Sequence, residues 1–162
     1  MSYIEKLLED VEVEWKALGE VSKVKRGKRV TKRQLSPEKK YPVYSGGVKP
    51  MGYFEKHNQE ENTITVVKYG TAGFVNFITE KFWANDVCYC VEPLSGLNKK
   101  YLLHLLKKIQ DQIYSLATDA IPAHLPTDAI NGLKIPIPCP DNPEKSLEIQ
   151  KKVVDILDKF TE

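Results

Sequence analysis

The last thirty residues of the chain, 133–162, constrain its fold most, because a strand, a turn and an amphipathic helix follow one another there. The apolar run 133–137 predicts a strand, which ends in a proline-rich turn. Asn142 suits an N-cap, Pro143 fits the first helical position, and Glu144 is favourable in the first turn. We therefore expect a helix that begins at Pro143 and runs almost to the end of the chain.

This helix carries an apolar stripe that requires a partner. Its members recur at intervals of four, three and four residues, as one face of an α-helix demands. The stripe residues are Ile149, Val153, Ile156 and Phe160. Val154 and Leu157 widen the stripe to a broad face. We expect one domain over residues 1–140 and, over residues 141–162, a coiled-coil-type helix that reaches out of the domain as an arm.

The composition is that of one globular domain. The 162 residues are 41% hydrophobic and 28% charged, which allows a sizeable core. No run approaches the roughly eighteen apolar residues of a membrane span, and the N-terminus lacks a signal-peptide pattern, so we expect a cytoplasmic protein without membrane contact. The cysteines are Cys88, Cys90 and Cys139, an odd number without a Cys-x-x-Cys pair. This spacing favours reduced core thiols over disulfides or a metal site.

Positive charge is concentrated in one stretch, although the net charge is only +2. Residues 21–50 contain ten basic side chains and a single acidic one, whereas residues 1–20 and 111–162 are both acidic. A local positive field attracts polyanions such as DNA. Arg26, Arg29 and Arg33 are the better candidates for defined contacts, because a guanidinium matches phosphate and guanine edges. The alternative is a solvated, lysine-rich loop.

Alternating and β-branched runs predict a sheet. The expected strands are 41–44, 63–69, 74–78 and 87–91, with 63–69 at the centre of the sheet. Helical periodicity predicts a short helix over residues 2–10, capped by Ser2, and one long core-packing helix that opens at Leu97-Asn98 and ends near Leu116. The fold class is therefore α+β, a single domain with a twisted mixed or antiparallel sheet and covering helices.

Two turns follow strands and carry small residues beside polar ones. Ser45-Gly46-Gly47 follows the first strand, with Tyr44 and Lys49 nearby, and its backbone amides could hold a phosphate. The segment 68–73 should form a hairpin tip that places Lys68, Tyr69 and Thr71 where they could enter a DNA groove. Ordinary hairpin turns are the alternative at both places.

Six motifs in order resemble those of target recognition domains in the specificity subunits of type I restriction-modification systems. They cover nearly the whole chain and are 15–21 (WKALGEV), 41–47 with Gly52-Tyr53, 69–73 (YGTAG), 83–87 (WANDV), 120–125 (AIPAHL) and 133–160. A full member of that family repeats domain and helix twice, whereas this chain contains one copy.

The resemblance implies a non-catalytic subunit that recognises a bipartite site on double-stranded DNA and directs the methyltransferase subunits, and indirectly the restriction subunit, to it. It also makes the loop 118–131 a plausible DNA contact through Thr118 and His124. With one repeat, we expect two chains to pair through the stripe residues of the C-terminal helix. No cofactor and no metal are expected. The residues expected to contact DNA are Arg26, Lys28, Arg29, Arg33, Tyr44, Ser45, Lys49, Lys68, Tyr69, Thr71, Thr118 and His124.

Three other functions stay open. The chain could be one half of a longer specificity subunit, or a stand-alone DNA-binding or interaction module without enzyme partners. It could also be a small metal-dependent nuclease, since Glu38-Lys39-Lys40 fits a Glu-x-Lys pattern with Asp10 as the earlier acid. No methyltransferase motif and no nucleophile elbow occurs in the sequence. The residues do not reveal the target DNA sequence.

Overall fold

The centre of the fold is a four-stranded antiparallel sheet with the strand order β2-β8-β5-β6. The structure is a computed structural model that describes residues 3–161. The strands are β2 (Ser22–Arg26), β5 (Thr63–Val67), β6 (Val75–Ile78) and β8 (Cys88–Pro93). Every residue of β5 is buried, as its run of β-branched residues predicts, and its central position is confirmed.

Two smaller sheets flank the central one. At one end, β1 (Val13–Ala17) pairs antiparallel with β9 (Lys134–Pro138), which lies one residue further along than predicted. At the other end, β3 (Tyr41–Tyr44) lies between β4 (Gly52–Phe54), its antiparallel hairpin partner, and β7 (Trp83–Ala84), to which it is parallel. The expected α+β class with mixed and antiparallel pairing is confirmed.

Within residues 3–161, five helices and one 3-10 turn precede the C-terminal helix. They are α1 (Tyr3–Leu7), α2 (Leu18–Val21), η1 (Lys32–Gln34), α3 (Lys99–Lys108), α4 (Gln110–Ser115) and α5 (Thr127–Asn131). The predicted first helix is thus shorter than expected, and its proposed cap, Ser2, lies outside the described residues. Helix α5 occupies a segment that was predicted to be loop.

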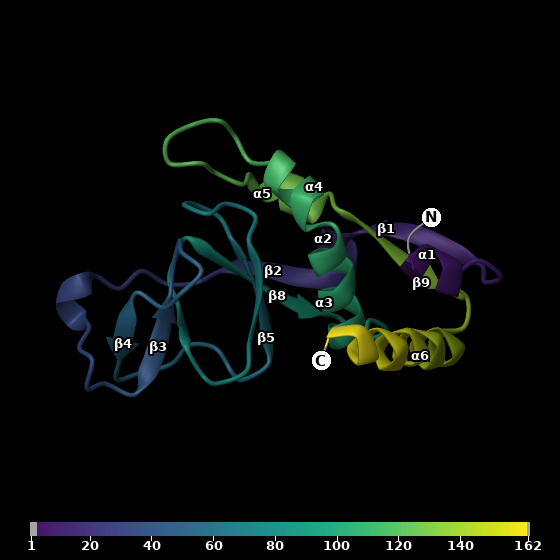
Figure 1. Ribbon diagram of the computed structural model, residues 1–162, viewed down its shortest axis with the longest axis horizontal. Coiled ribbons are helices and arrows are strands. Elements are labelled where there is room, and N and C mark those ends of the chain that lie inside the picture. The colour runs from purple at the N-terminus through teal and green to yellow at the C-terminus, as the bar shows by residue number, and fades with distance from the viewer. Residues whose placement is uncertain (1–2, 162) are drawn as a thin grey trace.

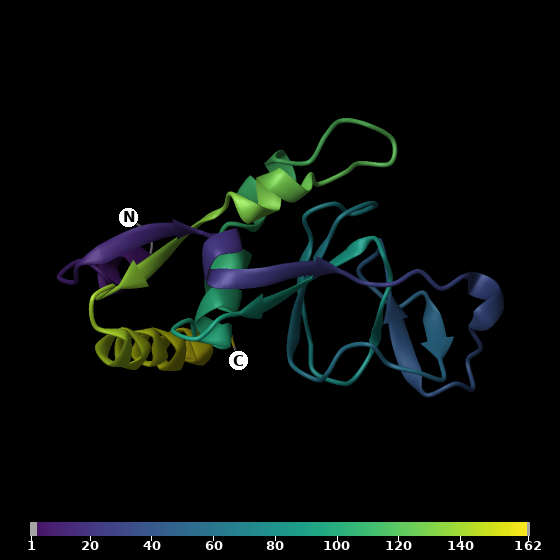
Figure 2. The same ribbon diagram turned by 180° about the vertical axis from the view of Figure 1, so that it is seen from behind.

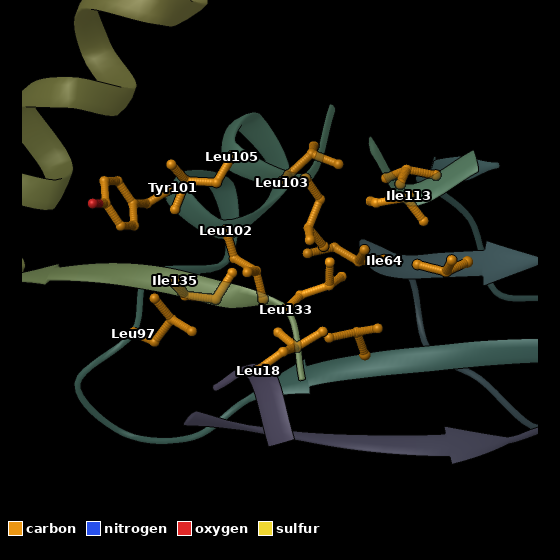
Figure 3. Close-up of a cluster of buried hydrophobic side chains, with 14 of the residues drawn as sticks. Leu18, Ile64, Leu97, Tyr101, Leu102, Leu103, Leu105, Ile113, Leu133 and Ile135 are labelled. Atoms are coloured by element: carbon orange, nitrogen blue, oxygen red, sulfur yellow. The ribbon is translucent and has the colours of Figure 1, made fainter. Parts of the chain in front are cut away.

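The main core forms where α3 packs between the sheets. Figure 3 shows Tyr101, Leu102 and Leu105 of α3 close to Ile135 of β9, with Leu18 of α2 nearby. Leu18, Leu102 and Ile135 are fully buried, and the hydroxyl of Tyr101 donates to the Pro136 carbonyl at 2.7 Å. One helix therefore joins the central sheet to the β1–β9 pair.

The prediction of one long middle helix is wrong. The helix is interrupted at Ile109, where φ is −97° and ψ is 23°, and this residue separates α3 from α4. The break allows Gln110 to turn inward instead of facing solvent as its position in a straight helix predicts. Its side-chain amide accepts from the Val75 backbone at 2.8 Å and donates to the Gly73 carbonyl at 2.6 Å. A tertiary contact thus overrides the local periodicity.

The C-terminal helix α6 (Pro143–Thr161) begins as predicted, with Asn142 accepting from the Lys145 backbone at 3.1 Å. It does not reach out as an arm, however. Figure 1 shows it folded back alongside α3. Gln150 is fully buried and bridges to the loop before α3, accepting from Asn98 N at 2.8 Å and donating to Gly96 O at 2.9 Å.

The apolar stripe on α6 therefore packs mainly against the core of its own chain. Val153 is 2% exposed and belongs to the main core, and Ile149 and Leu157 pack against that core. Ile156 is half-buried and Phe160 is 69% exposed. Val153 is thus buried within its own chain, contrary to the expectation that it contacts a second chain, whereas Ile149 and Ile156 are both partly exposed.

The molecule is elongated, with the β3–β4 hairpin at one end and α1, β9 and α6 at the other (Figure 1). The connection between α4 and α5 projects as a loop above the central sheet, as the reverse view in Figure 2 also shows. Within residues 3–161, no helix combines the length and the apolar character that a membrane crossing requires.

Candidate nucleic-acid interface

The basic segment 26–33 leaves the end of β2 and is held against the turn between β7 and β8. Gly27 N donates to Cys88 O at 3.1 Å, and Lys28 N donates to Ala84 O at 2.9 Å. A Cβ atom at Gly27 would overlap the Ala84 carbonyl oxygen, so only glycine permits this close approach. The Arg26 Nε also donates to the Asp86 carbonyl at 2.9 Å. The path of the basic segment is therefore fixed by the backbone.

The cations of this segment project into solvent without acidic partners. These side chains are exposed and form no ion pair within the described chain: Arg26, Lys28, Arg29, Lys32 and Arg33. By contrast, Lys39 is held by Glu55 at 3.0 Å, an interaction that lowers the pKa of that carboxyl. Cations that no carboxylate neutralises are free to attract phosphate groups.

Asn85 joins the basic segment to the turn that follows β3. This side chain is 5% exposed, and its Nδ2 donates to the Val30 carbonyl at 3.2 Å. Its backbone N–H donates to the Tyr44 carbonyl at 2.9 Å. A shallow hollow lies at this junction, lined in part by Arg29, Ser45 and Asn85. The two predicted contact regions therefore adjoin one another.

Hydrogen bonds connect the three predicted loops in sequence. Thr71 N donates to Gly46 O at 2.9 Å, which joins the turn after β3 to the turn between β5 and β6. Gly70 N donates to Ala123 O at 3.2 Å, which joins that turn to the projecting loop. The rings of Tyr69 and His124 stack with centroids 4.7 Å apart and planes 17° apart. We call the contiguous segments 26–33, 44–47, 68–71 and 118–124 the loop surface.

The residues expected to contact DNA differ in how exposed they are to solvent. Thr71 and Thr118 are exposed, and Tyr44, Ser45, Tyr69 and His124 are half-buried. Lys49 is exposed but lies in the β3–β4 connection, where it lines a second hollow with Lys32. Burial raises the pKa of Tyr44, assisted by electrostatic repulsion from Glu80 and Tyr53, above an ordinary value that already leaves the hydroxyl protonated at neutral pH.

Lys68 is not at an accessible hairpin tip, contrary to the expectation. It is 6% exposed, and its ammonium lies 2.9 Å from the Tyr89 hydroxyl and 3.1 Å from His124 Nε2. The polypeptide continues in β-like pairing past the end of β5, since Lys68 N donates to Val87 O and Leu125 N donates to Lys68 O, both at 2.8 Å. A buried lysine cannot reach a base edge directly.

Sequence reasoning missed the residues that hold the loops together. Tyr89 donates to the Leu125 carbonyl at 3.0 Å and lies 2.9 Å from the Thr127 hydroxyl. In the sequence, Tyr89 is one more aromatic residue in a buried strand, and nothing marks Thr127. For Asn85 a signal existed, since it stands in one of the six motifs, but its contacts could not be predicted.

The residues of the nuclease pattern do not meet. Asp10 follows α1, whereas Glu38 precedes β3, and these two elements lie at opposite ends of the molecule in Figure 1. Across residues 3–161 no cluster of three or more histidine, cysteine or acidic side chains has metal-binding geometry. The three cysteines are free thiols. Cys88 and Cys90 are buried, as predicted, whereas Cys139 is only half-buried and is not a core thiol.

A family model described as the type I restriction modification DNA specificity domain matches residues 10–162. The specificity subunit of a type I restriction enzyme of Escherichia coli is 34% identical over 173 residues, covering 99% of this chain and 41% of that protein. The EcoprrI specificity subunit of Escherichia coli is 29% identical over 187 residues, covering 99% and 45%. The chain thus spans about two fifths of the length of these curated relatives.

A solved structure has the same fold. The crystal structure of a type I restriction-modification system S subunit from M. genitalium superposes with a TM-score of 0.79, covering 93% of this chain and 40% of that one. The sequence identity is 24%, so this likeness concerns the fold.

Proposed function

The chain belongs to the family of type I restriction modification DNA specificity domains, and on that premise we propose that it recognises a specific sequence in double-stranded DNA. The observation that carries the proposal is the continuity of the loop surface, in which unneutralised cations adjoin three hydrogen-bonded loops. The cations would supply salt-dependent attraction to phosphates, which positions the protein, and the loops would read base edges.

Within this proposal the chain performs no chemistry itself and requires no cofactor or metal. It would direct methyltransferase subunits, and through them a restriction subunit, to the DNA site. Support comes from the curated relatives, both of which are specificity subunits of type I restriction enzymes. The exposed side chains of Lys49, Thr71 and Thr118 would contribute contacts to DNA at the margins of the loop surface.

The direct test is to co-express the chain with a type I methyltransferase subunit and to map methylated bases across the host genome. A new methylated motif that disappears when the chain is omitted would support the proposal. If both proteins are soluble and co-purify, yet no methylation appears, the chain does not direct a methyltransferase.

A binding experiment isolates the role of the cations. Replacing Arg26, Lys28 and Arg29 by alanine should weaken DNA binding and reduce the slope of log K against log salt by about one for each lost phosphate contact. The matched control replaces three lysines of α6, at the other end of the molecule: Lys145, Lys151 and Lys152. Equal losses in the two triple variants would mean that only net charge matters and would refute the assigned surface.

We extend the proposal to a two-fold pair of chains, which would read two identical half-sites in opposite orientation. Support comes from the relatives, which are more than twice as long as this chain. Because Val153 belongs to the core, the contact would involve the outer part of the stripe, Ile156 and Phe160. Replacing both by aspartate should give a folded monomer in light scattering. A monomeric wild-type chain at micromolar concentration would refute the pairing.

A further inference from the structure

The buried ammonium of Lys68 has no carboxylate partner within the described chain, which is unusual for a buried cation. Two polar atoms and two rings surround it instead. Nζ lies 2.9 Å from Tyr89 Oη and 3.1 Å from His124 Nε2. It also lies 5.3 Å from the ring centroid of Tyr69 and 5.1 Å from that of Tyr89. These neighbours stabilise a cation through lone pairs and ring faces.

The direction of each hydrogen bond in this cluster follows from donor counting. An ammonium has three donors and no lone pair, so both atoms beside it must accept. Tyr89 can accept because its own proton is donated to the Leu125 carbonyl at 3.0 Å. His124 can accept only if Nε2 carries no proton. The imidazole is then neutral, and its proton resides on the other nitrogen, Nδ1.

The Nδ1 atom of His124 is accessible to solvent. No described residue makes a hydrogen bond to it, and within residues 3–161 no buried side-chain nitrogen or oxygen lacks a partner. An unbonded Nδ1 must therefore be accessible. The ring is also held in place, because it stacks on Tyr69 and its backbone carbonyl accepts from Thr118 N at 2.8 Å. His124 thus presents one oriented N–H group at the loop surface.

We propose that Lys68 acts as a positioning residue that fixes His124 as a hydrogen-bond donor, and that this donor selects a base with an acceptor at one position of the target. In the major groove guanine offers the acceptors N7 and O6, whereas cytosine offers an N4 amino donor. Adenine and thymine also offer acceptors there, N7 and O4 respectively. His124 therefore accepts guanine, adenine or thymine and disfavours cytosine at the position it contacts. The reading role rests on the proposed DNA recognition, but the state of the imidazole does not.

The tautomer can be measured without DNA. Nitrogen-15 NMR of histidine-labelled protein distinguishes a protonated from an unprotonated ring nitrogen, and the chain has only three histidines. The resonances of His124 are those that vanish in His124→Gln. We expect Nδ1 of His124 to be protonated and Nε2 unprotonated at neutral pH. In Lys68→Met the constraint is lost, and the Nε2-protonated form should appear. Lys49→Met removes an exposed lysine and should leave the His124 signals unchanged.

The base preference is measured by selecting bound sequences from a random DNA library. For the wild type we expect about ten- to a hundredfold discrimination against cytosine at one position, the usual value of a good base contact. In Lys68→Met this discrimination should fall to a few-fold at that position alone. The control Lys49→Met should weaken binding to all sequences equally. His124→Gln changes a half-buried loop residue and should also lose the discrimination against cytosine. This variant tests the reading role if Lys68→Met does not fold.

Each outcome decides a different point. A proton on Nε2 of His124 in the wild type would overturn the inference, whatever the DNA experiment gives. Unaltered discrimination in both Lys68→Met and His124→Gln would overturn the reading role. A wild-type protein that selects no sequence at all would refute the proposed function, and the reading role with it, even where Nδ1 carries the proton.

Discussion

Replacing Gly46 by alanine should separate two loops of the loop surface. A Cβ atom at this position would lie well under 3.0 Å from the Tyr69 carbonyl oxygen, a backbone atom that cannot rotate away. The two loops would have to move apart by several tenths of an ångström, which strains or breaks the 2.9 Å hydrogen bond from Thr71 N to Gly46 O. The close approach therefore depends on the absence of a side chain.

The magnitude follows from three contributions. Loss of the hydrogen bond costs about 1 kcal/mol, and forcing an extra methyl group into a packed contact costs about 1–3 kcal/mol. Replacing glycine by alanine restores roughly 0.5 kcal/mol by restricting the unfolded chain. We expect the free energy of unfolding to fall by about 2 kcal/mol, which for a chain of this size lowers Tm by about 4–8 °C.

The neighbouring glycine provides a matched control. At Gly47 the nearest atom to a new Cβ would be the Lys49 carbonyl oxygen, 3.9 Å away, an ordinary contact. Gly47→Ala should therefore be neutral or slightly stabilising in urea unfolding followed by circular dichroism. Sequence-selective DNA binding should weaken in Gly46→Ala and persist in Gly47→Ala, although neither variant changes the charge. Equal stability of the two variants would refute the contact between the loops.

Three further predictions concern stability and thiol chemistry. Gln150→Ala should lower the free energy of unfolding by about 2–4 kcal/mol, because the fully buried side chain is lost and two part-buried backbone groups lose their partner. A change below about 1 kcal/mol in urea unfolding would mean that α6 is not anchored there. The hydrogen bond from His104 holds the pKa of Asp158 below its usual range. The stabilisation that this bond gives is therefore complete above the ordinary carboxyl pKa near 4 and disappears as pH falls through the lower pKa of the folded state. Plots of unfolding free energy against pH for the wild type and Asp158→Asn should converge in acid, and parallel plots would contradict this. The hydrogen bond with the neighbouring Cys88 thiol, together with burial, raises the pKa of Cys90. Iodoacetamide should therefore label Cys139 in the native protein and Cys90 only after unfolding, as mass spectrometry would reveal.

Elements whose signals are local were predicted from the sequence. The start of α6 follows from Asn142 and Pro143, which satisfy and preorganise the first turn without help from the rest of the chain. Strand β5 follows from its run of β-branched residues, which is typical of a strand buried on both faces. The loops that adjoin one another were also identified, because glycines and small polar residues mark turns wherever they occur.

Features that depend on distant partners were not predicted. Periodicity indicates one helix across Ile109, but the side chain of Gln110 satisfies the backbone of a turn 37 positions earlier, and the helix breaks there. The apolar stripe of α6 was correctly identified, yet its partner was not, since a hydrophobic face packs equally well against its own domain or against a second chain. The buried amide of Gln150, 54 positions from Gly96, settles that choice for most of the helix.

The sequence by itself thus determined the α+β class, the basic segment and the location of the loops, because propensity, capping and turn chemistry act over a few residues. Its six ordered motifs indicated the family by resemblance. Only the tertiary structure decided what these parts do together. Lys68 reads as one more exposed cation until the fold brings it to His124, 56 positions away, inside a cluster of rings and hydroxyls. The energy of such a contact depends on burial and donor geometry, which exist only once the distant segments have met.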